Sequence, residues 1–144
     1  MKLRLNVDEL NDDFFGETRL LGITVPVKNY QFCWQLNNLL GFDFRLNSDI
    51  EIHLKKKNRS YYFNIYQSQE PNSFLVHYLY HNQFDGEYLL PEFKHMDYLW
   101  LMKGDLVDEE RCNWLKTSIR NIAGVQLVAE LTNEQIRNKG NMVF

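Results

Sequence analysis

The chain contains Met96-Asp97-Tyr98-Leu99-Trp100-Leu101-Met102, a run that is apolar at every position except Asp97. Successive side chains of a β-strand point to opposite faces, so a run that is apolar on both faces predicts a central strand covered on both sides. By alternation, Asp97 shares a face with Leu99 and Leu101, and the opposite face carries Met96, Tyr98, Trp100 and Met102. A carboxylate buried in this way needs hydrogen-bond donors or an opposite charge as partners.

Other strands are predicted on both sides of this run. Upstream, short polar segments separate three apolar or alternating runs, and hairpin-length connections of this kind join antiparallel neighbours. We therefore expect an antiparallel meander that leads into the central strand. The three runs are Ile50–Leu54, Tyr61–Tyr66 and Phe74–Tyr80, and two further strands are expected at Leu20–Val25 and Val125–Leu131.

Two segments repeat apolar residues at the spacing of one helix face. The first is Tyr30–Leu40, with Asn29 as a possible N-cap and Gly41 as a left-handed C-terminal residue. The second is Asp108–Ile122, whose acidic first turn suits the positive end of a helix. Helices with one apolar face, together with strands joined by short connections, predict an α+β fold: a two-layer domain with an antiparallel β-meander packed against the helices.

Size and composition fit one soluble domain over residues 1–144. With 44% hydrophobic residues, the chain can bury a core without metal or disulfide staples. A net charge of −3 provides no general field for nucleic acid or an anionic membrane. No apolar run reaches membrane-helix length, and Met1–Glu9 turns acidic where a signal peptide is apolar, so we expect a cytoplasmic protein. Cys33 and Cys112 lie in helical patterns, which predicts reduced core thiols.

One motif is recognisable, Leu90-Pro91-Glu92-Phe93-Lys94-His95-Met96-Asp97-Tyr98. It resembles the signature of the IPExxxVDY family, a set of small cytosolic proteins of the Bacteroidetes group. Pro91, Glu92, Asp97 and Tyr98 match the named positions, whereas Leu90 and Met96 replace Ile and Val with other apolar side chains. The resemblance implies a cytosolic bacterial protein and no particular reaction.

Two roles are open for the motif acids. In the structural one, Asp97 accepts hydrogen bonds from the Tyr88–Lys94 turn, from tyrosine hydroxyls or from a nearby cation, and Pro91 stands in the turn before the strand. In the functional one, Asp97, Glu92 and His95 form a catalytic or ligand-holding group. We favour the structural role because the sequence lacks a Gly-rich phosphate loop, a nucleophile elbow and a metal-binding motif. No catalytic residue, metal or cofactor is therefore predicted.

The histidines do not predict a metal site. His77 and His81 are four residues apart in an expected strand, where that spacing is about 13 Å and too long for two ligands of one ion. His53 and His77 fall on neighbouring expected strands and could face each other, as exposed histidines on a sheet surface.

A basic cluster is formed by Lys55, Lys56, Lys57 and Arg59, close to Tyr61 and Tyr62. Cations beside aromatic side chains could hold a single-stranded RNA backbone and stack a base. They also fit a solvated hairpin tip whose charges prevent edge-to-edge aggregation, which is the interpretation that we prefer.

The expected function is that of a non-catalytic protein-interaction module. It rests on five tyrosines that fall on neighbouring strands, where a meander that buries one face would leave several exposed as an interface for a protein partner or a second copy. They are Tyr61, Tyr62, Tyr66, Tyr78 and Tyr80. Two alternatives stay open: a small-molecule-binding protein or enzyme that uses Asp97, Glu92 and His95, and a weak RNA-associated factor that uses the basic hairpin.

Overall fold

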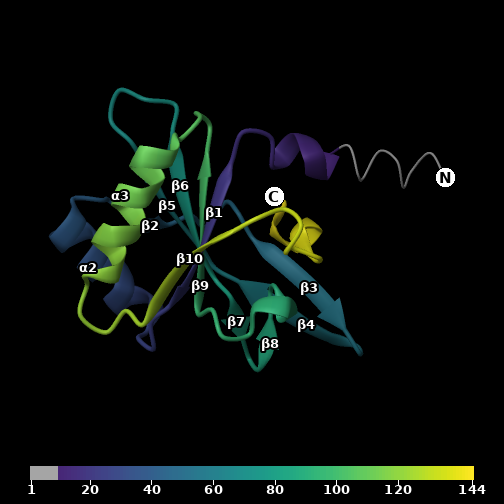
Figure 1. Cartoon of the computed structure of the whole chain (residues 1–144). Helices are drawn as coiled ribbons and strands as arrows, with labels where there is room; N and C mark the ends of the chain where they lie inside the picture. The colour runs from purple at the N-terminus through teal and green to yellow at the C-terminus, as the bar shows by residue number, and fades with distance from the viewer. Residues whose placement is uncertain (1–9) are drawn as a thin grey trace.

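A six-stranded sheet lies at the centre of the computed structural model, which describes residues 10–144 (Figure 1). Every neighbouring pair in this sheet is antiparallel. The strand order is β10 (Leu127–Leu131), β1 (Arg19–Thr24), β9 (Tyr98–Lys103), β6 (Val76–His81), β5 (Ile65–Gln69) and β2 (Arg45–Leu46). The predicted central strand is confirmed, because β9 lies between β1 and β6 and is buried from Tyr98 through Met102.

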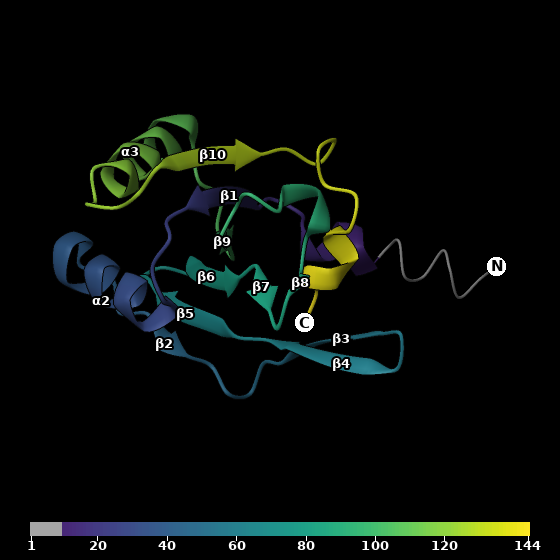
Figure 2. The same cartoon turned by 90° about the horizontal axis from the view of Figure 1, so that it is seen from below.

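Two helices cover one face of the sheet, α2 (Asn29–Leu40) and α3 (Glu109–Arg120). Figure 2 shows both helices on one side of the molecule, away from the β3–β4 ribbon. Their apolar stripes share one core cluster with the strand residues Leu21, Leu79 and Trp100; the buried helix residues are Phe32, Cys33, Leu36, Cys112, Leu115 and Ile119. The α+β class is therefore confirmed, with both predicted helices present.

The helix ends follow from local chemistry. Asp108 caps α3 by accepting the Arg111 N–H at 2.8 Å, and Gly41 ends α2 in the left-handed conformation, with φ of 78°. The predicted cap at Asn29 is wrong by one position, because Asn29 is the first helical residue and Lys28 precedes the helix without a side-chain cap.

The meander prediction is wrong in one respect. The run Tyr61–Tyr66 is not one strand, because the chain changes partner at Asn64. Before that residue, β4 (Arg59–Phe63) pairs with β3 (Ile52–Lys56) in a separate ribbon, and after it β5 pairs with β6 and β2. Alternation of buried and exposed residues continues through the break, so the sequence pattern carries no sign of it.

The second face of the sheet is also covered, so the expected two-layer arrangement is incomplete. Its core cluster joins Leu99 and Leu101 of β9 to residues of the β3–β4 ribbon and of the C-terminal segment, such as Phe63 and Met142. Two short hairpin strands and two 3₁₀ turns complete this layer: β7 (Gln83–Phe84), β8 (Glu87–Tyr88), η1 (Pro91–Phe93) and η2 (Lys139–Met142).

The N-terminal segment of the described chain packs against the second face of the sheet. Residues 10–14 are helical and bring Phe14 and Phe15 into the second-face cluster, whereas Met1–Glu9, the stretch that the signal-peptide argument used, lies outside the described residues. Within residues 10–144 no helix is long and apolar enough to cross a membrane. Cys33 and Cys112 are buried free thiols, as predicted.

Candidate functional site

Asp97 and Tyr98 hold the connection between β1 and α2. The Asp97 carboxylate accepts the Val25 N–H at 2.8 Å, and the Tyr98 hydroxyl donates to the Val27 carbonyl at 2.7 Å. Asp97 is half-buried, and this burial raises its pKa although the bond from Val25 and the nearby His81 oppose the shift. A backbone donor satisfies Asp97 as expected, but the donor follows β1 and does not belong to the Tyr88–Lys94 turn.

The predicted alternation fails just before β9. Met96 packs in the same cluster as Leu99 and Leu101, and not with Tyr98 and Trp100. The reason is that β9 starts only at Tyr98, so Met96 is still in the preceding turn, where strand periodicity does not apply.

Glu92 binds the C-terminal segment. Its carboxylate accepts the N–H groups of Arg137 at 2.6 Å and Asn138 at 2.7 Å, and the Asn138 side-chain amide at 2.9 Å. Burial raises the pKa of Glu92, but these hydrogen bonds outweigh it and the net shift is downward. His95 is exposed, and Pro91 opens η1 where its missing N–H costs nothing. Both motif carboxylates therefore bind backbone N–H groups of their own chain, which favours the structural role.

The motif loop is organised by a residue that the sequence did not single out. Asn82 is fully buried, and its side-chain amide donates to the carbonyls of Phe93 at 3.0 Å and Met96 at 2.9 Å. Its side-chain oxygen accepts the Leu90 N–H at 2.8 Å. An asparagine just after a strand is also typical of an exposed turn, so nothing in the sequence distinguished this one.

The basic cluster forms the tip of the β3–β4 ribbon. Lys57 and Asn58 have positive φ, as a tight hairpin turn requires. Two of the four cations are paired with acids of the β7–β8 hairpin: Lys56 contacts Glu87 at 3.0 Å, and Arg59 contacts Asp85 at 2.7 Å. These pairs leave Lys55 and Lys57 as the cations of the cluster without such a partner among the described residues.

The expected tyrosine surface does not form. Tyr61 and Tyr80 are buried, Tyr66 and Tyr78 are half-buried, and Tyr62 alone of the five is exposed, at 43%. The second layer contains Tyr61 and covers the sheet face that carries Tyr78 and Tyr80. Tyr66 packs on the opposite face, against the cluster that the helices cover.

The two histidines expected on a common surface also lie apart. His53 is exposed on β3 and stacks on Tyr62, with ring centroids 4.7 Å apart. His77 is on β6, only 2% exposed, and its Nδ1 accepts the indole N–H of Trp100 at 2.9 Å. The prediction of exposed histidines is therefore wrong for His77, because helices cover that face of β6.

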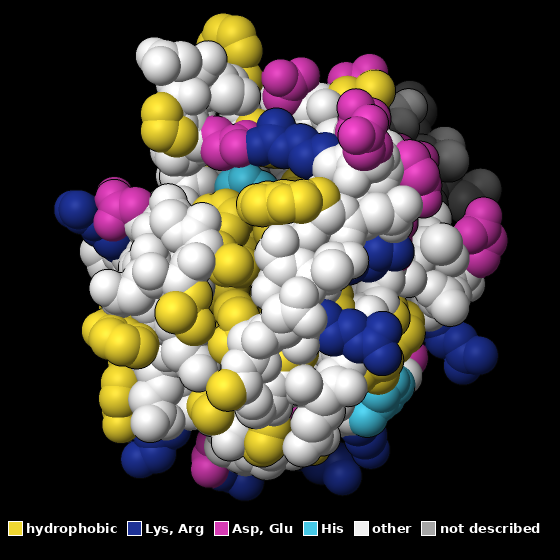
Figure 3. Space-filling model, turned by 60° about the vertical axis from the view of Figure 1, so that its left-hand side comes forward, with side chains coloured by type: hydrophobic (Ala, Val, Ile, Leu, Met, Phe, Trp, Pro, Cys, Tyr) yellow, Lys and Arg dark blue, Asp and Glu magenta, His cyan; other side chains and the backbone are white. Residues whose placement is uncertain are grey.

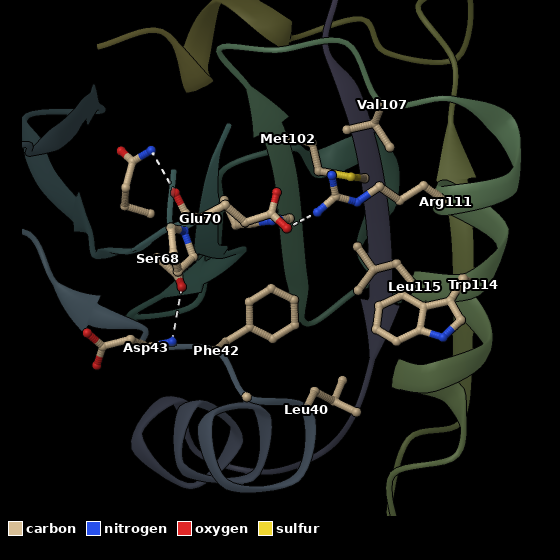
Figure 4. Close-up of a pocket in the computed structure, with 14 residues that line it drawn as sticks. Leu40, Phe42, Asp43, Ser68, Glu70, Met102, Val107, Arg111, Trp114 and Leu115 are labelled. Atoms are coloured by element: carbon tan, nitrogen blue, oxygen red, sulfur yellow. Dashed lines mark hydrogen bonds and ion pairs between the residues drawn. The ribbon is translucent and has the colours of Figure 1, made fainter. Parts of the chain in front are cut away.

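His77 lies at a cavity of about 210 Å³ between the C-terminal end of α2 and α3, which we name the His77 pocket. Figure 4 shows Leu40 and Phe42 on one side, Trp114 and Leu115 of α3 on the other, and Met102 of β9 behind them. The same face of the molecule carries a stripe of hydrophobic side chains with acidic and basic groups at one end (Figure 3). The pocket is therefore largely apolar, with charged residues at one side.

Three polar residues that line the His77 pocket lie together at one side of it: His77, Glu70 and Arg111. Arg111 extends from α3 to form an ion pair with Glu70, which follows β5 (Figure 4). His77 Nε2 and Glu70 Oε2 are both buried, have no hydrogen-bond partner among the described residues and lie 4.0 Å apart. Burial lowers the pKa of His77 to about 4, so the ring is neutral at neutral pH.

A second feature is the exposed surface of α2. Trp34 is 63% exposed and lies one turn from the exposed Tyr30, and together with Gln31 they border a shallow depression. The helix has no charged residue along its whole length. This surface is aromatic and uncharged.

Comparisons with known proteins do not assign a function to the His77 pocket or to the exposed surface of α2. Models of known protein families give no match to the chain, and a search of curated proteins gives none either.

Proposed function

We propose that this protein is a non-catalytic binding protein that holds a small molecule in the His77 pocket. The observation that carries the proposal is a pair of buried polar atoms, His77 Nε2 and Glu70 Oε2, which belong to residues lining the cavity and have no hydrogen-bond partner within residues 10–144. Leaving a buried donor or acceptor unpaired costs about 1–3 kcal/mol, and a ligand that pairs both atoms recovers this cost. An apolar cavity with a few convergent polar groups is also the usual form of a small-molecule site.

The same residues favour binding over catalysis. His77 is a poor general base at neutral pH because its pKa is far below that pH. The Glu70 carboxylate is engaged by Arg111, and the Ser68 hydroxyl accepts the Asp43 N–H at 3.0 Å, so neither residue is arranged as a nucleophile beside a base.

Two exposed tryptophans provide a matched test. Trp114 lines the His77 pocket and is 60% exposed, whereas Trp34 is equally exposed on α2, outside the pocket lining. We expect a screen of small apolar compounds, followed by NMR, to yield ligands that shift the Trp114 indole resonance. Trp114→Ala should weaken them about tenfold through the loss of one pocket wall, and Trp34→Ala should not. Equal effects of the two substitutions, or a screen without pocket ligands, would reject the proposal.

A second candidate function is self-association through α2. Tyr30 and Trp34 form an aromatic surface on a helix without charges, so two copies can pack face to face without burying a charge or opposing like charges. Aromatic residues are enriched at interfaces of this kind. The partner that we propose is therefore a second copy of the chain.

The same two variants test self-association, and here Trp34→Ala should have the effect and Trp114→Ala should not. In sedimentation equilibrium the parent should form a dimer, Trp34→Ala should be monomeric, and Trp114→Ala should stay dimeric. A parent that is monomeric over the whole concentration range, or a dimer that Trp34→Ala leaves intact, would reject it.

Membership of the IPExxxVDY family and a cytoplasmic location are part of the proposal. The proposal of family membership rests on the sequence motif, in which Pro91, Glu92, Asp97 and Tyr98 match the named positions. An RNA-associated role is not proposed, because two of the four cations on the hairpin tip are paired with acids.

A further inference from the structure

The two unpartnered atoms of the His77 pocket have opposite hydrogen-bonding roles. His77 Nδ1 accepts the Trp100 indole N–H, so the neutral ring carries its own proton on Nε2, which is then a donor. Glu70 Oε2 belongs to a carboxylate paired with Arg111 and is an acceptor. A ligand group that satisfies both atoms must accept one hydrogen bond and donate another.

The spacing of the two atoms fits a single oxygen. They lie 4.0 Å apart, and one hydroxyl oxygen can stand about 2.8 Å from each, within the normal range of a hydrogen bond. The angle at that oxygen is then roughly 90°, which a hydroxyl tolerates when it accepts on one side and donates on the other. We propose that the ligand of the His77 pocket carries a hydroxyl group that bridges His77 and Glu70, an inference that rests on the proposed function.

Charged ligand groups fit less well at this point. An anion would face the carboxylate of Glu70, and a cation would face the N–H of His77 and the guanidinium group of Arg111. A neutral group avoids both repulsions, and it does not compete for the ion pair between Glu70 and Arg111.

The apolar residues that line the His77 pocket indicate the chemical nature of the rest of the ligand. Phe42, Met102, Leu115 and Trp114 present aromatic and aliphatic surface, and a cavity of about 210 Å³ accommodates one substituted aromatic ring. The chemical class is therefore a small apolar alcohol or phenol.

Three probes that differ at one group test the inference: 4-ethylphenol, 4-ethylanisole and ethylbenzene. The phenol accepts and donates, the methyl ether only accepts, and the hydrocarbon does neither. NMR titration of the parent protein, followed at the Trp114 indole resonance, should show the phenol binding at least about tenfold more tightly than either of the others. The ether leaves the Glu70 acceptor unpaired, and the hydrocarbon leaves both atoms unpaired.

The outcomes separate the two proposals. If ethylbenzene binds in the pocket as tightly as the phenol, the hydroxyl inference is wrong and the pocket proposal stands. If no probe shifts the Trp114 resonance, both are wrong.

A substitution in the protein identifies the acceptor. In Glu70→Gln the amide oxygen is held by Arg111, so the amide N–H₂ faces His77 and the site offers only donors. The preference for the phenol over the ether should then disappear, whereas Glu110→Gln, at an exposed position on the first turn of α3, should retain it. A preference that survives Glu70→Gln would overturn the assignment of Glu70, and the probe series in the parent protein does not depend on this variant.

Discussion

The indole nitrogen of Trp100 lies 2.9 Å from Nδ1 of His77, and both side chains are buried. An indole N–H can only donate, so it fixes which imidazole nitrogen accepts and which carries the proton. The bond joins two strands of the central sheet, β9 and β6. This contact in the core therefore determines that His77 offers a hydrogen-bond donor, Nε2–H, on the side of the pocket.

Titration of His77 should make stability depend on pH. Its pKa is about 4 in the folded protein, below the ordinary value of 6.5, so between these values the unfolded chain takes up a proton that the folded chain does not. Stability should fall as the pH is lowered, by about 2 kcal/mol from pH 7 to pH 5. In His77→Gln the side-chain oxygen still accepts from Trp100 but does not titrate, so urea unfolding should show a loss smaller by that amount. Glu70 and Arg111 are common to both proteins, and equal losses would contradict the prediction.

The hydrogen bond between Asp97 and Val25 should contribute more to the free energy of unfolding than the charge of Asp97 does. Asp97→Ala removes the acceptor and leaves the Val25 N–H unpaired, at a cost of about 1–3 kcal/mol in the free energy of unfolding. Asp97→Asn keeps an acceptor oxygen and removes a partly buried charge, so it should cost less. Chemical denaturation measures both. An alanine variant as stable as the parent would show that Asp97 is not structural.

The hydrogen bonds to Glu92 should stabilise the C-terminal segment in its folded position. In Glu92→Ala the N–H groups of Arg137 and Asn138 lose their shared acceptor, and we expect their amide hydrogens to exchange at least about tenfold faster. Glu134→Ala, at an exposed position in the same region, is the control. Unchanged exchange in Glu92→Ala would mean that the segment is held by other contacts.

The basic hairpin should not bind RNA at physiological salt. With Lys56 and Arg59 paired to acids, two cations are left for phosphates, which gives a slope of log K against log salt of about −1.4 for a single strand. So few contacts, on a chain with a net charge of −3, correspond to a dissociation constant weaker than about 10⁻⁴ M. Filter binding with mixed single-stranded RNA measures it. Micromolar retention that is lost when Lys55, Lys56, Lys57 and Arg59 are all replaced would reverse this conclusion.

Local patterns predicted the parts of the fold that depend on local chemistry. The two-sided apolar run at Tyr98–Met102 became the buried strand β9, and the acidic start after Asp108 became a capped helix. The change of partner at Asn64 was not predictable, because it alters which strand is paired and leaves the alternation of side chains unchanged.

The candidate site was not predictable for a related reason. Glu70 lies in a polar turn, His77 at a polar position of a strand, and Arg111 on an exposed turn of a helix, and each has an ordinary local explanation. They meet only because β6 is an inner strand and α3 packs on the same face of the sheet. The tyrosines were misjudged in the same way, since Tyr61 and Tyr80 are buried by a layer that the sequence did not reveal.

A crystal structure of the protein with 4-ethylphenol would show whether one hydroxyl group bridges His77 and Glu70. We expect the phenol ring between Phe42 and Leu115, with its oxygen within about 3.2 Å of both His77 Nε2 and Glu70 Oε2. A phenol bound outside this pocket, or bound in it with the hydroxyl turned to solvent, would contradict the proposed bridge between His77 and Glu70.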